Sequence, residues 1–230
     1  MNRAVAILIM SGPVELERAR KGLPRCASRI LGATGWNSDA LSADVHRFEL
    51  SGARSGPVVG QSVHAQRGHD FGERLENAVD ELSAAGYERL VIVGTDCPQL
   101  EQADLARAID LLQTNRLVLG PDHRGGCWLI GLHTRDRRLL AEITWQRNTD
   151  FRALCDRIEP HSLAILETKF DIDSPDDLIA LARADRRFAA LAEPSIVTSG
   201  HRNPLVARLA NLRLTWQLPP PAQLRHSFSV

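Results

Sequence analysis

The segment Val91-Ile92-Val93-Gly94-Thr95-Asp96-Cys97-Pro98 decides the fold of this chain. It is a short apolar run that stops abruptly at an acid and a proline, a pattern typical of a buried parallel strand. Ligands of open α/β sheets bind beyond the C-terminal ends of such strands. The segment therefore predicts a ligand site with the Asp96 carboxylate at its edge.

Apolar runs alternate with helical patterns on both sides of this segment. We expect one helix that begins near residue 72 and further helices at 102–113, 138–143, 151–158 and 175–184. We expect strands at 4–10, 45–50, 87–94, 117–120, 128–132 and 163–166. Residues 15–31 have a weaker helical pattern, and 32–60 read as loops around an edge strand. The alternation predicts an α/β fold with three layers, α/β/α, and a mostly parallel central sheet, in which 87–120 forms a β-α-β unit.

The length of 230 residues allows one substantial domain, which we place at residues 1–194. The composition changes after Pro194, where Asp and Glu are absent and the run Pro219-Pro220-Pro221 occurs. We interpret 195–230 as a basic, proline-containing C-terminal tail, either flexible or docked on a protein partner.

The balance of charge argues against several partners. The 28 basic and 28 acidic residues cancel, so no global positive field attracts nucleic acid or an anionic membrane. The apolar run 4–10 is too short to span a bilayer. The four cysteines are widely separated and unlike a disulfide framework. We therefore expect a cytoplasmic protein without a membrane span.

Several motifs occur in the order found in a known family. The chain resembles the bacterial glycosyltransferase-A-like proteins associated with radical-SAM and selenodomain proteins, a family known as a domain of unknown function. The resemblance covers residues 61–182 and rests on Gln66-x-Gly68-x-Asp70-x-Gly72-x-Arg74, Gly94-x-Asp96-x-Pro98-x-Leu100, Gly120-Pro121, Gly125-Gly126-x-Trp128-x-Ile130-Gly131, Trp145 and Asp171-Ile172-Asp173-Ser174-Pro175-Asp176-Asp177-Leu178. It implies the nucleotide-diphospho-sugar transferase (GT-A-like) fold.

The chain departs from this family at two places. The family usually has an acid before the paired glycines and an aromatic residue after them, where this chain has Arg124 and Cys127. The first loop lacks the family's ordered glycine, lysine, threonine and arginine cluster, and Arg18, Arg20 and Lys21 substitute for it only loosely. Both departures concern the part of the site that would hold phosphates.

Asp96 is the candidate catalytic residue and metal ligand. The departure of a nucleotide diphosphate is commonly assisted by Mg²⁺ or Mn²⁺, and such hard cations often take only one or two protein carboxylates. Asp173 is the candidate second ligand and Asp171 its substitute, because both precede a helix in a loop where ligands are expected. A turn-capping role explains Asp96 or Asp173 as an alternative.

The resemblance also implies a set of donor-binding residues. Arg124 could reach a phosphate or be a solvated surface arginine, and the glycines beside it could admit a substrate or simply form a hairpin turn. The helix that begins near residue 72 could present its amides to an anion, or Asp70 could cap it. The donor-binding candidates are Gly72, Arg74, Gly120, Pro121, Arg124, Gly125 and Gly126.

Three functions remain open at this point. The leading hypothesis is a metal-assisted transferase that uses a nucleotide-activated small-molecule donor, namely a glycosyltransferase that acts on a nucleotide sugar. The second is a nucleotidyltransferase that joins a nucleotide to a phosphorylated acceptor and releases pyrophosphate. The third is a catalytically inactive binding or regulatory module of the same fold, suggested by Arg124, Cys127 and the atypical first loop.

Overall fold

The computed structural model describes residues 3–29, 31, 38–50, 60–141 and 143–192. Its strands are β1 (Arg3–Ser11), β2 (Asp44–Glu49), β3 (Gln61–Ala65), β4 (Tyr87–Val93), β5 (Leu117–Pro121), β6 (Cys127–His133) and β7 (Leu163–Ile165). Its α-helices are α1 (Val14–Arg20), α2 (Ser38–Leu41), α3 (Phe71–Ala84), α4 (Gln102–Leu111), α5 (Asp150–Cys155) and α6 (Pro175–Ala184). Short 3₁₀ helices are η1 (Arg25–Arg29), η2 (Thr134–Leu140), η3 (Pro160–Ser162) and η4 (Arg186–Ala192).

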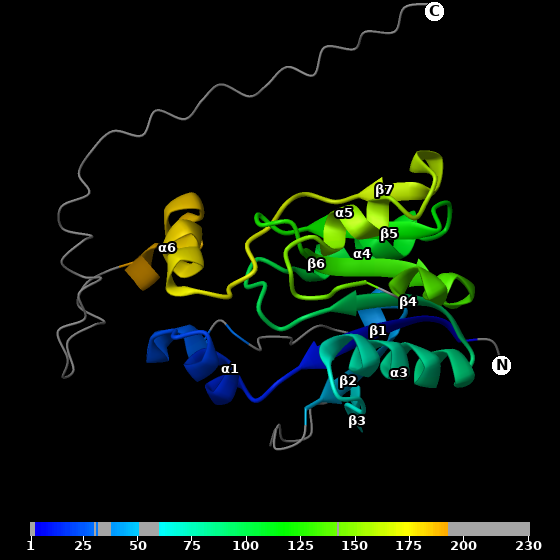
Figure 1. Cartoon of the computed structure of the whole chain (residues 1–230), viewed down its shortest axis with the longest axis horizontal. Coiled ribbons are helices and arrows are strands. Elements are labelled where there is room, and N and C mark those ends of the chain that lie inside the picture. The colour runs from blue at the N-terminus through cyan, green and yellow to red at the C-terminus, as the bar shows by residue number, and fades with distance from the viewer. Residues whose placement is uncertain (1–2, 30, 32–37, 51–59, 142, 193–230) are drawn as a thin grey trace, which may run out of the picture. The chain divides into compact units, whose positions relative to one another are not determined.

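The strands form one seven-stranded sheet in the order β3-β2-β1-β4-β6-β5-β7 (Figure 1). Every neighbouring pair is parallel except those that include β6, which runs antiparallel to both β4 and β5. The predicted mostly parallel sheet is confirmed. The C-terminal ends of β1, β4 and β5 therefore meet the start of β6 at one edge, where a ligand site is expected.

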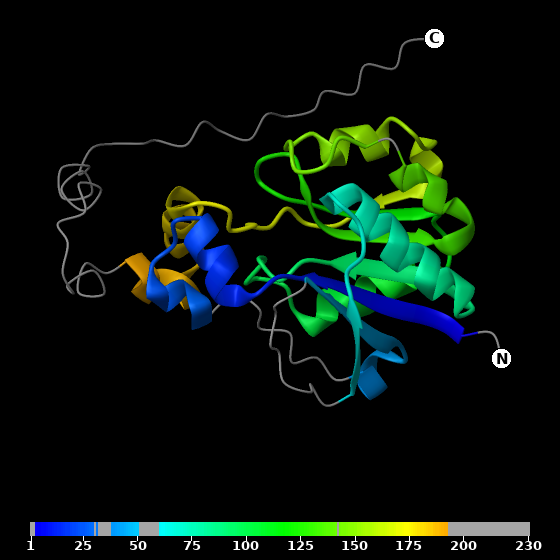
Figure 2. The same cartoon turned by 60° about the horizontal axis from the view of Figure 1, so that its bottom comes forward.

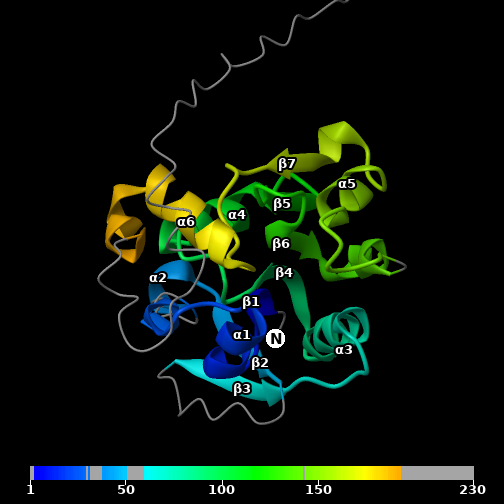
Figure 3. The same cartoon turned by 60° about the vertical axis from the view of Figure 1, so that its left-hand side comes forward.

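Helices cover both faces of the sheet, as Figure 3 shows in a view that separates the layers. Alternate residues of β1 enter two different cores, because successive side chains of a strand point to opposite faces. Ala6 and Leu8 pack under α3, η2 and α5, whereas Ile7 and Ile9 pack under α2 and α4. The predicted three-layer α/β/α fold is thus the observed one.

A third, smaller core lies beside the sheet. Leu23, Ala27 and Leu31 pack against Ile172 and against α6, and Figure 2 shows α1 next to α6. Helix α6 begins as its sequence predicts, with Pro175 in its first turn and the Ser174 hydroxyl accepting a hydrogen bond from the Asp177 N–H (3.3 Å). This packing brings the first loop close to the segment before α6.

Some elements differ from the sequence prediction. Strand β3 was not predicted, and it displaces β2 from the edge of the sheet, so the expectation of an edge strand at 45–50 is wrong. The predicted β-α-β unit has no directly paired strands, because β6 inserts between β4 and β5. The helix expected at 138–143 is instead the 3₁₀ helix η2. Alternation along the chain reports element type, whereas pairing depends on which strands meet in space.

Within the described ranges, no helix has the length and apolar character needed to cross a bilayer. The C-terminal tail that we assigned to residues 195–230 lies outside the described residues.

Candidate functional site

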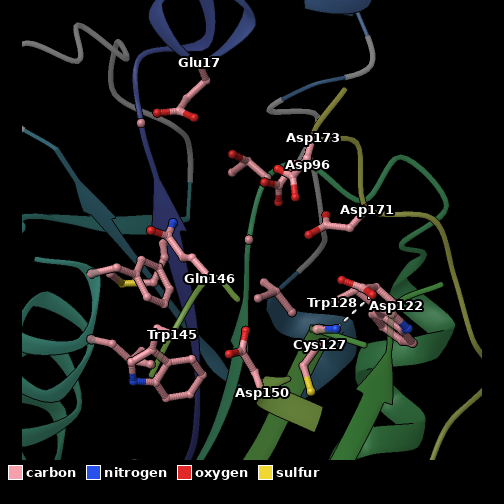
Figure 4. A pocket seen from close by; sticks show the side chains of 18 of the residues that line it. Glu17, Asp96, Asp122, Cys127, Trp128, Trp145, Gln146, Asp150, Asp171 and Asp173 are labelled. Carbon is pink, nitrogen blue, oxygen red and sulfur yellow. Dashed lines mark hydrogen bonds between the residues drawn. The ribbon is translucent and has the colours of Figure 1, made fainter. Parts of the chain in front are cut away.

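A pocket of about 720 Å³ opens at the predicted edge of the sheet. Its walls come from the β1–α1 connection, the end of β4, the β5–β6 hairpin, the segment 145–150 and the segment between β7 and α6 (Figure 4). Six of its residues are acidic: Glu17, Asp96, Asp122, Asp150, Asp171 and Asp173. The pocket therefore joins segments that lie far apart in the sequence and concentrates carboxyl groups.

Lys21 lies among these carboxylates. Its Nζ donates to Asp96 Oδ2 (2.7 Å) and to the Ile172 carbonyl (2.8 Å), and it is 2.9 Å from Asp173 Oδ1. The Lys21 side chain is only 3% exposed. Burial disfavours its charged form, but the two carboxylates outweigh this effect and raise the pKa of Lys21 above its usual value. The first loop thus places a fixed positive charge at the Asp96 carboxylate.

Asp96 and Asp171 form a close carboxyl pair. The Ile172 N–H donates to the Asp96 carbonyl (2.9 Å), which holds the two segments together. Burial raises the pKa of both carboxyls, but Lys21 lowers that of Asp96 below its usual value, while burial and the Asp96 charge leave the pKa of Asp171 well raised. The environment of Asp171 therefore favours its neutral form, and its Oδ1 is buried without a hydrogen-bond partner among the described residues.

Arg124 extends the charged network to α6. It forms ion pairs with Asp173 and with Asp177 (3.2 Å to Oδ2), and His123 Nε2 lies 2.9 Å from Asp177 Oδ1. Burial raises the pKa of Asp177, but hydrogen bonds from Ser174 and His123 bring it below its usual value. Arg124 is therefore a pocket residue held by carboxylates and not a solvated surface arginine.

The β5–β6 hairpin is organised by one carboxylate. Asp122 Oδ1 accepts hydrogen bonds from the N–H groups of Arg124 (2.6 Å), Gly125 (2.7 Å) and Gly126 (2.9 Å). Gly125 has φ +105°, and a Cβ there would lie 2.4 Å from the Asn148 carbonyl oxygen. The paired glycines therefore form a hairpin turn pressed against the segment 145–150, and Gly126 also lines the pocket.

The remaining donor-binding candidates are placed differently. Arg74 lines the pocket, but Gly72, Gly120, Pro121 and Gly125 are not among its lining residues. Gly72 makes room for the Trp145 ring, and Gly120 for Trp128. Asp70 caps α3 by accepting a hydrogen bond from the Glu73 N–H (2.9 Å). The Asp70 side chain, and not an anion, therefore occupies the acceptor position at that amide.

Sequence reasoning undervalued three pocket residues. Lys21 was only a loose substitute for a family motif, and nothing in its spacing indicates that it reaches Asp96. Asp122 and Asp150 were not considered, because single acids beside a turn or at a helix start usually have local roles. The sequence does contain one weak indication for Asp122: this acid precedes Gly125-Gly126 by three residues. Such a pattern is typical of a side chain that caps a turn.

The acidic cluster has the chemistry of a divalent-cation site without its final geometry. Among the described residues, no three His, Cys, Asp or Glu side chains are already arranged around one ion position. The Lys21 ammonium lies between Asp96 and Asp173, and burial beside the Asp96 charge raises the pKa of Asp171. The Lys21 ammonium balances negative charge that a hard cation would also balance. These residues therefore offer oxygen donors of the kind that Mg²⁺ and Mn²⁺ prefer, without a complete ligand set in place among the described residues.

A curated relative shares sequence with half of the chain. It is described as a 2-phospho-L-lactate guanylyltransferase of Methanopyrus kandleri, and it is 30% identical over 126 residues. The match covers 54% of this chain and 65% of the relative.

Solved structures share the fold. One, from Desulfovibrio desulfuricans G20 and provisionally described as a nucleotide-diphospho-sugar transferase, is 22% identical with a TM-score of 0.67, covering 86% of this chain and 94% of the other. Another is Rv0371c of Mycobacterium tuberculosis H37Rv in complex with manganese, 16% identical with a TM-score of 0.53, covering 80% and 100%. The predicted nucleotide-diphospho-sugar transferase-like fold is confirmed. Residues 38–147 match the model of the family described as "Uncharacterized protein conserved in bacteria (DUF2064)".

Proposed function

We propose that this chain is a metal-assisted nucleotidyltransferase that joins a nucleotide to a small phosphorylated acceptor. The observation that carries the proposal is the convergence of Lys21, Asp96, Asp171 and Asp173 in one pocket at the C-terminal edge of the sheet. A cation and several carboxylates at this edge suit a ligand that arrives as a polyphosphate with a divalent metal. The guanylyltransferase relative supports the same reaction class.

In the proposed reaction, a phosphate oxygen of the acceptor attacks the α-phosphorus of a nucleoside triphosphate. A new P–O bond forms, the bond from the α-phosphorus to its bridging oxygen breaks, and the electron pair leaves with pyrophosphate. Lys21 and Arg124 bind phosphate oxygens, because each is a fixed cation on the pocket wall. Little covalent chemistry is required of the protein, so positioning and charge stabilisation account for most of catalysis.

Asp96, with Asp171 and Asp173, would hold Mg²⁺ or Mn²⁺, which when bound would neutralise charge on the leaving pyrophosphate. The buried Oδ1 of Asp171, which has no hydrogen-bond partner among the described residues, supports this assignment. The manganese complex of a protein of the same fold also supports it. Asp96 has the catalytic role in this proposal, since it contacts both Lys21 and Asp171.

Glycosyl transfer from a nucleotide sugar is the second candidate. It would use the same metal and diphosphate contacts, and the Desulfovibrio neighbour supports it through its provisional description. The products distinguish the two reactions: pyrophosphate is released from a nucleoside triphosphate, whereas a nucleoside diphosphate is released from a nucleotide sugar. The inactive-module alternative loses one of its grounds, because Lys21 supplies the first-loop cation whose absence suggested it.

Calorimetric titration tests the proposal. The full chain is titrated with GTP, CTP, ATP, UDP-glucose and GDP-mannose, with and without Mn²⁺, and each positive ligand is then tested for turnover. We expect Mn²⁺-dependent triphosphate binding that Asp96→Asn weakens by about tenfold to a hundredfold. Asp80→Asn, which alters an exposed ion pair with Arg137, is the matched control and should leave binding unchanged.

Full binding and turnover by Asp96→Asn would refute the assigned role of Asp96. Metal-dependent nucleotide binding without turnover in the wild type would favour the binding module over both enzymes. Release of a nucleoside diphosphate, and not pyrophosphate, would establish the glycosyltransferase instead.

A further inference from the structure

The pocket contains a second polar wall that the phosphate chemistry does not use. Asp150 is only 8% exposed, and its Oδ1 is buried without a hydrogen-bond partner among the described residues. Figure 4 shows its carboxyl group directed toward the open centre of the pocket, with Trp145 and Gln146 on one side and the Asp96 cluster at the opposite end. Buried carboxyl oxygens are normally hydrogen-bonded, so an orphan on a pocket wall indicates a missing ligand.

The surroundings of Asp150 disfavour an anion. Burial raises the pKa of the Asp150 carboxyl, although a hydrogen bond from the Gln146 backbone opposes this effect; the Asp122 charge raises the pKa further, and a weaker hydrogen bond from the Arg147 backbone lowers it. The charged neighbour with the largest effect on the Asp150 pKa is thus another carboxylate, Asp122. Asp122 and Asp150 would repel a phosphate or carboxylate placed here. A neutral hydroxyl could donate a hydrogen bond to either side chain when that side chain is ionised, or accept one from it when it is protonated.

Trp145 provides an aromatic surface on the same wall, with its indole nitrogen on the side of the ring away from Asp150 (Figure 4). Its indole Nε1–H is buried without a partner among the described residues, although the residue lines the pocket. Its ring packs edge-on against Phe71, with centroids 5.8 Å apart, and crowds Gly72 at the start of α3. A buried indole N–H normally finds an acceptor, and an aromatic ring beside it offers an apolar surface to a carbon skeleton.

The turn between these two residues is held in place by the hairpin. Gln146 and Asn148 have positive φ values of 62° and 57°, which are uncommon for residues other than glycine. The Asn148 carbonyl packs against Gly125, and the Phe151 N–H donates to the Gly125 carbonyl (3.1 Å). Such backbone conformations persist where neighbouring structure enforces them, so the wall is preformed.

We propose that Trp145 and Asp150 form an acceptor subsite that binds an uncharged, hydroxyl-bearing group. This inference rests on the proposed function and deepens it: the acceptor is a phosphorylated polyol or sugar. Its phosphate lies at the end of the pocket that holds Lys21 and Arg124, and its hydroxyl groups lie against Trp145 and Asp150. The pocket thus offers Lys21 and Arg124 to the phosphate at one end and the Trp145 and Asp150 side chains to the hydroxyl groups on the other wall, so that it selects both parts of one small molecule.

Matched pairs of phosphates test the subsite by calorimetry in the presence of Mn²⁺. Glycerol 3-phosphate is compared with n-propyl phosphate, and glucose 1-phosphate with cyclohexyl phosphate, so that each pair shares charge but differs in hydroxyl groups. We expect at least one hydroxylated probe to bind the wild type about tenfold more tightly than its counterpart. Asp150→Ala and the near-isosteric Asp150→Asn should reduce this ratio, with the alanine variant close to one.

Asp156→Asn, just past the same short helix and outside the pocket, is the control and should keep the wild-type ratio. In ¹⁵N-tryptophan-labelled protein, the Trp145 indole N–H resonance, assigned with Trp145→Phe, should shift with the hydroxylated probe only.

Three results would overturn the proposal: an equal affinity of both members of each pair for the wild type, an absence of binding by any probe, or an unchanged ratio in Asp150→Ala. Nucleotide binding is measured on the same samples. If the wild type binds no nucleotide with Mn²⁺, the proposed function fails; if it does and the ratio is one, only the subsite fails.

Discussion

Replacement of Lys21 by methionine should destabilise the metal-free protein by about 2 kcal/mol. Removing one partner of a fully buried ion pair typically costs about 3–5 kcal/mol, because an uncompensated charge remains. Here the ammonium is 3% exposed, but the Asp96 and Asp173 side chains are 31% and 38% exposed, so water can partly replace the lost contacts. We therefore take roughly half of that range. Methionine retains most of the side-chain volume and removes only the charge and its hydrogen bonds.

The assay is urea unfolding in EDTA and again in millimolar Mn²⁺. A loss of about 2 kcal/mol changes the unfolding equilibrium about thirtyfold and is readily measured. Mn²⁺ should restore more stability to Lys21→Met than it adds to the wild type, since a cation that binds only the folded state stabilises it according to its affinity. The released carboxylates should bind it more tightly than the occupied ones.

Lys169→Met is the matched control. Lys169 is also largely buried, at 13% exposure, donates to the Gln99 carbonyl (2.9 Å) and pairs with Asp104, but it does not line the pocket. Its replacement should lower stability without changing the response to Mn²⁺. The reasoning fails if Lys21→Met unfolds within about 0.5 kcal/mol of the wild type, a difference typical of neutral surface changes. It also fails if Mn²⁺ affects both variants equally.

Three further outcomes follow from the same geometry. The pKa of Asp171 is higher in the folded protein than its usual value of about 4 in an unfolded chain, so between these two pKa values the folded state binds more protons than the unfolded state. The free energy of unfolding should therefore fall as the pH rises from about 4 toward the pKa of Asp171 in the folded protein. Asp171→Asn should flatten this slope in EDTA and be more stable than the wild type at pH 7 by urea unfolding; an unchanged slope would contradict the assignment. Gly120→Ala should cost about 1–3 kcal/mol or more, because its Cβ would lie 2.4 Å from the Trp128 ring, whereas Gly131→Ala, with its closest contact at 3.2 Å, should cost less; equal losses would count against the packing. Gly125→Ala should weaken the preference for the hydroxylated probe that the wild type favours, because it displaces the Asn148 turn, while Mn²⁺-dependent nucleotide binding measured by calorimetry stays within about threefold.

Local patterns were sufficient to predict most of the elements. The run ending at Asp96 has the composition of a strand buried on both faces, and the observed β4 is the central strand between β1 and β6. Likewise the Ser174-Pro175 start of α6 follows from capping chemistry that involves neighbours only three residues apart. Strand β3 escaped prediction because its exposed, polar residues at the sheet edge lack an apolar pattern.

The strand order was decided by contacts that no local pattern encodes. A strand with the composition of β6 can pair in either direction, and the hairpin geometry at Asp122 made it return beside β5. The same contacts placed Asp150 on the pocket wall, because the Asn148 turn packs on Gly125. The acids at 122 and 150 are ordinary in sequence and become candidates only through burial in one cavity.

The sequence by itself determined the fold class, the edge of the sheet that holds the site, and Asp96 as a candidate at that edge, because alternation and strand-end position are local properties. Only the tertiary structure decided which charges meet. Lys21 and Asp96 are 75 residues apart, and Arg124 and Asp173 are 49 apart. Electrostatic interactions depend on distance and burial in space, so the raised pKa of Asp171 and the buried charge of Lys21 exist only in the folded chain.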